Sequence, residues 1–313
     1  MVTSRPPPPL IAVVGPTATG KSALALTLAR EMPVEILAAD SRQVYRGMDV
    51  GTAKPTAAQR AQVPHHLLDL ADPDERFTVA DWLGHARAAV DAVLRRGRMP
   101  MLVGGTGLYV ASLVDGYDFG SRPWSPELRE RLAAELEAEG LPALAARLAE
   151  LDPTTAARTD VRNPRRVLSA LERIAAGGGG AEPRSSPWSG RVALVGIARP
   201  RPVVYRRIDT RAVDLFATGL VEEVRGLLAA GYAPDLPAMS GHGYREAARL
   251  IAGTSTLEEA IADTARRTRQ YAKRQLSWFG RDPRIVWIPA GTGPADAPSV
   301  VRRAADAIRR LLA

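Results

Sequence analysis

The stretch 15–22, which reads Gly-Pro-Thr-Ala-Thr-Gly-Lys-Ser, has the spacing G-x-x-x-x-G-K-[ST] of a phosphate-binding loop, or P-loop. In such a loop the backbone N–H groups point inward and form an anion cradle, to which the positive end of the following helix contributes. Lys21 would supply a charge for the outer phosphate, and the Ser22 hydroxyl would supply a ligand for Mg²⁺. We therefore expect the chain to bind a di- or triphosphate, and this stretch alone leaves open which one.

Asp40 is an acid at the end of the apolar run 34–39, where a buried strand would deliver it to the phosphate site. A carboxylate there could hold Mg²⁺ through water, or it could act as a general base beside the phosphate. It could also simply cap a turn, as Asp before Ser often does. The placement favours a functional role over the cap and does not choose between metal and base.

The run Gly104-Gly105-Thr106-Gly107 follows a third apolar stretch, 99–103. At the carboxyl end of a strand, Thr106 can present a hydroxyl to a reacting group. The alternative is that the glycines only permit a tight turn.

Two basic segments could face a polyanion. On a helix over 266–279, Arg266, Arg269 and Lys273 line one face, while Tyr271, Gln275 and Trp278 line its neighbour. A basic helix with aromatic and amide side chains can hold phosphates and stack on or hydrogen-bond to bases. The alternative is a surface helix with its aromatic residues in the core. The second segment, 163–166, reads first as a helix start with solvated arginines.

The elements that must position these residues alternate along the chain. Apolar runs typical of strands occupy 10–14, 34–39, 99–103, 192–197 and 284–288, and helical spacing occupies 23–30, 77–96, 108–114, 203–230, 257–279 and 300–312. This alternation predicts an α/β fold: a P-loop core with a parallel sheet and helices on both faces. Ligands bind outside the carboxyl ends of such strands, so we expect the P-loop, Asp40 and Thr106 to converge.

A change in composition predicts a second domain. From 125 to 174 the chain is rich in Ala, Leu, Glu and Arg, has helical periodicity and contains no strand candidate. A Gly/Ser/Pro-rich stretch at 177–190 reads as a flexible linker. We predict an inserted small all-α domain at 119–191, with the core formed by 1–118 and 192–313. The alternative is a long crossover lid.

Composition also limits the class of protein. The chain has 313 residues, a formal net charge of +8, no cysteine and four scattered histidines, so we expect neither disulfides nor a zinc site. Its first nine residues lack the apolar segment of a signal peptide, and no apolar run reaches the roughly 18 residues of a membrane span. We expect a cytoplasmic monomer. The positive charge fits a polyanionic partner, although an arginine-rich composition alone would give the same charge.

Taken together, these motifs resemble one family, the tRNA dimethylallyltransferases, also called tRNA isopentenyltransferases. The resemblance spans nearly the whole chain and rests on GPTATGKS (15–22), DSRQVYRGMDVGTAKP (40–55), HHLLD (65–69), GGTGLY (104–109), NPRRVL (163–168), GYRE (243–246) and TRQYAKRQLSWF (268–279). The second and the last of these are long and specific. One departure is Gly280, followed by Arg281, where the family often has a basic residue; it concerns a single phosphate contact.

The resemblance implies transfer of a dimethylallyl group from dimethylallyl diphosphate to the exocyclic amine of the adenine just 3′ of the anticodon. It implies Mg²⁺ as cofactor, a helical domain that clasps the anticodon stem-loop, Asp40 as general base, and Thr106 as a bridge to the reacting centre. The residues it implies for the diphosphate are Gly15, Pro16, Thr17, Ala18, Thr19, Gly20, Lys21, Ser22 and Arg245, with Ser22 also on the metal. Those it implies for tRNA are Asp40, Ser41, Arg42, Gln43, Thr106, Arg129, Arg165, Arg166, Val167, Leu168, Ser169, Lys273, Arg274, Gln275 and Trp278.

Two other functions remain as alternatives. A P-loop kinase of a small substrate would use Asp40 to take the proton of an acceptor hydroxyl, but it leaves the basic aromatic helix unexplained. A nucleotide-switched RNA-binding protein would explain that helix and leave Asp40 unexplained.

Overall fold

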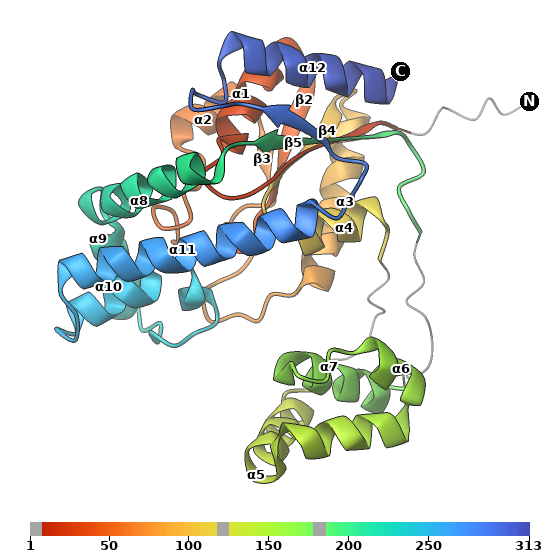
Figure 1. The fold of residues 1–313 in the computed structure, drawn as a ribbon, viewed down its shortest axis with the longest axis vertical. Helices are drawn as coiled ribbons and strands as arrows, with labels where there is room; N and C mark the ends of the chain where they lie inside the picture. Colours follow the sequence, from red (N-terminus) through yellow and green to blue (C-terminus); the bar gives the residue numbers. More distant parts are fainter. Residues whose placement is uncertain (1–7, 118–124, 178–185) are drawn as a thin grey trace, which may run out of the picture. The chain divides into compact units, whose positions relative to one another are not determined.

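The computed structural model describes residues 8–117, 125–177 and 186–313. Six strands form one sheet in the order β3-β2-β4-β1-β5-β6, and every pairing between neighbouring strands is parallel (Figure 1). The strands are β1 (Leu10–Val14), β2 (Val34–Ala39), β3 (His65–His66), β4 (Met99–Gly104), β5 (Val192–Ala198) and β6 (Val286–Pro289). The predicted α/β fold with a parallel sheet is confirmed.

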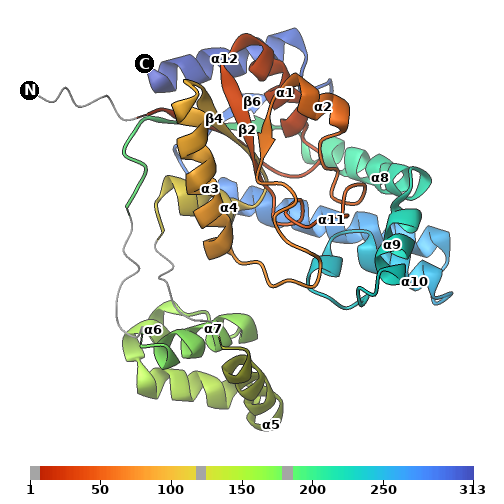
Figure 2. The ribbon, with the colours of Figure 1, turned by 180° about the vertical axis from the view of Figure 1, so that it is seen from behind.

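Helices cover both faces of the sheet, and strands β1 and β2 are buried along their whole length, as expected for a parallel sheet (Figure 2). Helices α1 (Lys21–Glu31) and α12 (Pro298–Leu312) pack on Ile11 and Val13 of β1. The alternate residues of β1 point the other way and are equally buried. On that second face lie α3 (Val79–Arg95) and α4 (Gly107–Val114).

A helical layer follows β5 in the sequence. It consists of α8 (Arg201–Ala217), α9 (Leu220–Ala229), the 3₁₀ turn η1 (Ala238–Ser240), α10 (Tyr244–Ile251) and α11 (Leu257–Phe279). Gly219, at a φ of 112°, separates α8 from α9 within the segment 203–230 that the sequence predicted to be helical. Helix α11 packs along α8 through small apolar residues, among them Ala212 and Ala265. Sequence periodicity missed α10 because it is only eight residues long and begins within a glycine-rich turn.

The chain divides into two compact units, one formed by 1–116 with 187–313 and the other by 117–186. The sequence-based boundaries were 119 and 191. In the described part of the smaller unit the regular elements are α5 (Pro126–Leu151), α6 (Pro153–Arg158) and α7 (Pro164–Ala175). Helix α5 is kinked at Gly140, and α5 packs with α7 around a core of leucines that includes Leu144 and Leu171. Most of the predicted linker, residues 178–185, lies outside the described residues.

The pair His65-His66 forms the edge strand β3. His66 contacts the buried Glu35 of β2, with Nε2 2.7 Å from Oε2. Glu35 also accepts two hydrogen bonds from the Arg96 guanidinium, at 2.9 and 2.6 Å. This buried carboxylate therefore ties the end of α3 to the edge of the sheet.

Among the described residues, no helix combines the length and the apolar character that crossing a membrane requires.

Helix α2 (Ala57–Gln62) lies between β2 and β3 in the sequence, outside the stretches for which helical spacing predicted a helix. Thr56 and Gln59 form a reciprocal capping box at its start.

Candidate functional site

The stretch 15–22 joins β1 to α1 as the spacing predicted, with Lys21 and Ser22 in the first turn of the helix. Gly20 precedes the helix at a φ of 99°, a conformation that favours glycine. The Thr19 hydroxyl donates to the Pro16 carbonyl at 2.9 Å, and the Lys21 ammonium donates to the same carbonyl at 2.7 Å. The loop is therefore closed on itself around the start of α1, where an anion is favoured.

Two arginines support this loop from neighbouring elements. Arg199, just after β5, donates from Nε to the Thr19 carbonyl at 2.8 Å and from NH1 to the Gly293 carbonyl at 2.7 Å. Arg207 of α8 donates to the Ala18 carbonyl at 2.8 Å. Because both contacts are made to carbonyl oxygens, the two arginines stabilise the loop without occupying its N–H groups.

Arg211 lies one helical turn after Arg207 on α8 and brings a further positive charge to the site. Burial lowers the pKa of Lys21 to about 8; the charge of Asp40 opposes this shift, and that of Arg211 adds to it. Burial also lowers the pKa of Arg211, again against the effect of Asp40. Lys21, Arg211 and Asp40 thus form one electrostatic cluster, which is the arrangement expected around a polyphosphate.

Asp40 and Thr106 meet at the carboxyl edge of the sheet, as the topology predicted. Asp40 follows β2, and one of its carboxylate oxygens, Oδ1, accepts from the Arg42 N–H at 2.9 Å. The Thr106 hydroxyl, which follows β4, accepts from the Ser41 N–H at 3.0 Å. The turn-capping role considered for Asp40 therefore occupies one oxygen, and no contact among the described residues is assigned to the other.

The motif at 40–55 has two parts: its first residues lie beside Asp40 at the site, and its later residues support the loop. In the first, the Arg42 guanidinium donates to the Pro237 carbonyl at 2.8 Å, and the Gln43 amide donates to the Thr52 carbonyl at 3.2 Å. In the second, Lys54 is buried and pairs with Asp49 and Asp69 at 2.8 and 2.5 Å. The two ion pairs of Lys54 therefore hold the loop of this motif in place.

The same loop is anchored to α9 by Glu223. Its carboxylate accepts from the N–H groups of Asp49, Val50 and Gly51 at 2.7, 2.6 and 3.2 Å. It also accepts from the Tyr244 hydroxyl at 2.6 Å. Such a row of backbone donors is a common setting for an anion, here supplied by the protein itself.

Residues implied for tRNA in the smaller unit fall into two groups. Arg165, Arg166 and Ser169 of α7 are exposed. Val167 and Leu168 lie in the helical core, 0% and 5% exposed, so their side chains are shielded from solvent. Arg129 of α5 forms an ion pair with Glu172 at 3.0 Å.

On α11, Lys273, Arg274 and Trp278 are exposed, whereas Gln275 is buried at 5% exposure. Arg274 lies over the Tyr271 ring, 5.8 Å from its centroid. Helical periodicity places Gln275 on the inward face of α11, and its contact with RNA stays a prediction.

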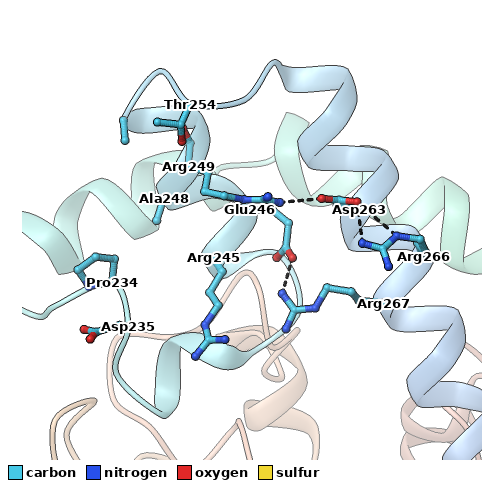
Figure 3. A pocket seen from close by; sticks show the side chains of 11 residues that line it. Pro234, Asp235, Arg245, Glu246, Ala248, Arg249, Thr254, Asp263, Arg266 and Arg267 are labelled. Carbon is cyan, nitrogen blue, oxygen red and sulfur yellow. Dashed lines mark hydrogen bonds and ion pairs between the residues drawn. The ribbon is translucent and has the colours of Figure 1, made fainter.

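Arg245 of α10 lines a surface cavity of about 510 Å³ (Figure 3). Glu246 and Arg267 form an ion pair in its wall, and Asp263 pairs with Arg249 and Arg266, while the Arg245 side chain extends away from these pairs. None of the residues that line the cavity belongs to the P-loop. The predicted contact of Arg245 with a diphosphate thus has no support from its position.

A metal would depend here on few protein ligands. Within the described ranges, no group of three or more His, Cys, Asp or Glu side chains could hold an ion. Ser22 is exposed at the start of α1, and Asp40 stands at the same edge of the sheet. Such a set fits Mg²⁺ that arrives with a diphosphate, since Mg²⁺ is commonly bound by few protein oxygens together with substrate phosphates.

Sequence reasoning missed Arg207 and Arg211. They are four residues apart, and each directly precedes a buried apolar position of α8, Ile208 or Ala212. A helical projection of α8 places both arginines beside the row of buried apolar residues on this helix, and that placement is the sequence signal for them. The assignment of α8 to the neighbourhood of the P-loop, however, follows from tertiary packing.

Comparison with known proteins gives consistent matches. The family profile described as IPP transferase matches residues 43–282, and that described as isopentenyl transferase matches residues 8–69. A tRNA dimethylallyltransferase of Roseiflexus castenholzii is 48% identical over 304 residues, which are 96% of this chain and 98% of the relative. One of Heliobacterium modesticaldum is 44% identical over 283 residues, 89% of this chain and 88% of the relative.

Two solved structures also match this chain. The tRNA isopentenylpyrophosphate transferase of Bacillus halodurans has a TM-score of 0.70 and 36% identity, over 96% of this chain and 97% of that chain. A eukaryotic dimethylallyltransferase acting on tRNA has a TM-score of 0.79 and 24% identity, over 95% of this chain and 77% of that chain, which is a likeness of fold.

Proposed function

Since the chain belongs to the IPP transferase family, we propose that it is a tRNA dimethylallyltransferase. It transfers a dimethylallyl group from dimethylallyl diphosphate to N6 of the adenine 3′ of the anticodon in tRNA. The observation that carries the proposal is the convergence of the P-loop, Asp40 and Thr106 at one edge of the sheet. An anion cradle beside a carboxylate is what attack on a carbon bearing a diphosphate requires.

In the reaction, a bond forms between N6 of the adenine and the terminal carbon of the dimethylallyl group. The bond between that carbon and the diphosphate oxygen breaks, and its electron pair leaves with the diphosphate. The amine is a poor nucleophile because its lone pair is delocalised into the ring, so it must lose a proton as it attacks. Asp40 accepts this proton through the carboxylate oxygen that the Arg42 N–H does not occupy.

The diphosphate leaving group gains negative charge as the bond breaks, and the P-loop stabilises it. Lys21, Arg211 and the N–H groups at the start of α1 supply fixed positive charge there. Mg²⁺, held by Ser22 and the diphosphate, would neutralise further charge when bound. Arg211 thus supplies, in addition to Lys21, the positively charged diphosphate contact that the family resemblance implied for Arg245.

For tRNA, the exposed arginines Arg165 and Arg166 of α7 and the exposed Lys273 of α11 would bind backbone phosphates. The adenine must be unstacked to reach the pocket, and the exposed Trp278 offers a ring on which a base can stack. Arg129 would contribute by orienting its pair Glu172 and the adjoining helix.

The experiment separates this function from its rivals. The protein is incubated with unmodified tRNA, Mg²⁺ and labelled dimethylallyl diphosphate without ATP, and separately with ATP and no prenyl donor. We expect label in the tRNA in the first reaction and no ATP consumption in the second. ATP consumption without label transfer would favour a kinase or a nucleotide switch and reject the proposal.

A further inference from the structure

Three side chains of α11 face the glycine loop 104–107. They are Tyr271, Gln275 and Trp278, at helical spacings of four and three, so they form one stripe along the helix. A Cβ added at Gly105 would overlap the Gln275 amide, and one added at Gly107 would overlap the Trp278 ring. Helix α11 thus lies directly on this loop, and the glycines there make room for it.

Gln275 sits at the centre of the stripe and joins two loops of the site. Its Oε1 accepts from the Thr17 N–H of the P-loop at 2.8 Å, and its Nε2 donates to the Gly105 carbonyl at 2.8 Å. The side chain is 5% exposed, so both bonds are shielded from water. The oxygen and the nitrogen of this buried amide bind the backbones of two different loops. The amide therefore fixes the distance between the loops, because an unpaired buried oxygen or nitrogen carries a desolvation cost.

The two loops have different tasks in the reaction. The P-loop binds the leaving group, and the glycine loop carries Thr106, whose hydroxyl holds the Ser41 N–H beside Asp40. Tyr271 lies close to this arrangement, since Thr106 and Gln275 both act to lower the pKa of its hydroxyl, which burial raises. A shift of about 1 Å between base and leaving group can cost two orders of magnitude in rate.

We infer that Gln275 is a positioning residue that sets the spacing between the diphosphate cradle and the loop beside the general base. This inference rests on the proposed function, but it assigns Gln275 to the protein interior in place of the RNA contact that its motif suggested. It acts through Thr17 and Gly105 and touches neither substrate.

The test compares three variants in the full chain. Gln275→Met keeps the side-chain volume and removes both hydrogen bonds. Gly105→Ala leaves Gln275 in place but displaces its amide. Gln270→Met is the matched control, since Gln270 is exposed on the same helix and no contact among the described residues is assigned to it.

Affinities for inorganic diphosphate with Mg²⁺ and for an unmodified tRNA transcript are measured separately by titration. We expect Gln275→Met and Gly105→Ala each to weaken diphosphate binding about tenfold, as loss of a shielded hydrogen bond implies, and to leave tRNA affinity within about twofold. The double variant should be little worse than either single variant, because both act on one contact. Gln270→Met should change neither affinity.

Two outcomes would overturn the inference. Weakened tRNA binding with unchanged diphosphate binding would make Gln275 an RNA contact. A lowered melting temperature with both affinities unchanged would make it a purely structural residue. Neither measurement needs prenyl transfer, so failure of the proposed function, seen as no label transfer by the wild-type protein, is distinguished from failure of this inference.

Discussion

The Thr106 hydroxyl accepts a hydrogen bond of 3.0 Å from the Ser41 N–H, although the two residues are 65 positions apart. The bond joins the segments that follow β2 and β4, which are neighbours in the sheet. It places Thr106 directly beside the turn that presents Asp40. Thr106 is therefore well placed to keep Asp40, the proposed general base, in position.

Replacing Thr106 by Val retains its shape and removes the hydroxyl that holds Ser41. We expect the rate constant for prenyl transfer to fall by about 10- to 100-fold, because an unpaired buried N–H costs about 1–3 kcal/mol and the Asp40 turn loosens. Thr106→Ser should recover most of the rate. Single-turnover transfer at saturating tRNA measures this, and an equal loss in the Ser variant would show that the methyl group matters instead.

Arg211 is expected to bind the diphosphate through its charge. Arg211→Ala should raise KM for dimethylallyl diphosphate and weaken inorganic diphosphate binding by about 10- to 100-fold, with unchanged tRNA affinity. Arg206→Ala is the control, because Arg206 is exposed on the same helix. If the two variants bind diphosphate equally well, Arg211 does not belong to the cradle.

Lys21 should make diphosphate binding depend on pH. Burial lowers the pKa of the free residue to about 8, so the ammonium is lost as pH rises through that value. A bound diphosphate raises this pKa, and binding near pH 8 should therefore be accompanied by proton uptake. Calorimetry in buffers of different ionisation enthalpy detects it.

The matched control for this pH dependence is Lys21→Arg, which keeps the charge at every pH examined. Between pH 7 and 9.5 the wild-type affinity should fall relative to the variant, since the titration of the ligand itself is common to both proteins. Parallel pH profiles would contradict the role of Lys21.

Glu35 should make stability depend on pH. The hydrogen-bonded Arg96 guanidinium is the main cause that lowers the pKa of Glu35 from 4.5 to about 2. Because the folded-state pKa is lowered, the stabilisation is complete above about pH 4.5 and is lost as pH falls toward 2. Glu35→Gln should cost about 2 kcal/mol at pH 7, allowing for the partial exposure of Arg96.

Urea unfolding of wild type and Glu35→Gln measures that difference between pH 7 and 3. The gap in unfolding free energy should narrow below about pH 4.5. A gap that stays constant across this range would show that the loss comes from packing and not from the charge.

The sequence predicted the sheet and the convergence of the site because parallel strands place their carboxyl ends at one edge. Asp40 and Thr106 each follow the end of a strand, and the P-loop that carries Lys21 joins β1 to α1, so their proximity needs no knowledge of how the later helices pack. Arg211 is different, since it lies on a helix whose place beside the P-loop is decided by how α8 packs on α11.

The same limit applies to other residues of the predicted site. Gln275 has the chemistry of an RNA contact, and only the position of α11 on the glycine loop reveals that it faces inward. Val167 and Leu168 share a motif with exposed arginines but are apolar, and a helix places them in its core. Arg245 lies next to the glycine turn of its motif, yet α10 directs it to a surface cavity.

The central claim is that Asp40 takes the proton of the attacking amine while the P-loop holds the leaving group. Single-turnover transfer of labelled dimethylallyl to unmodified tRNA by Asp40→Asn, with tRNA affinity measured in parallel, tests it most directly. We predict a rate about 10²- to 10⁴-fold lower, with tRNA affinity within about threefold of wild type. A normal rate at saturating tRNA, with affinity lost, would instead make Asp40 an RNA contact and contradict the account.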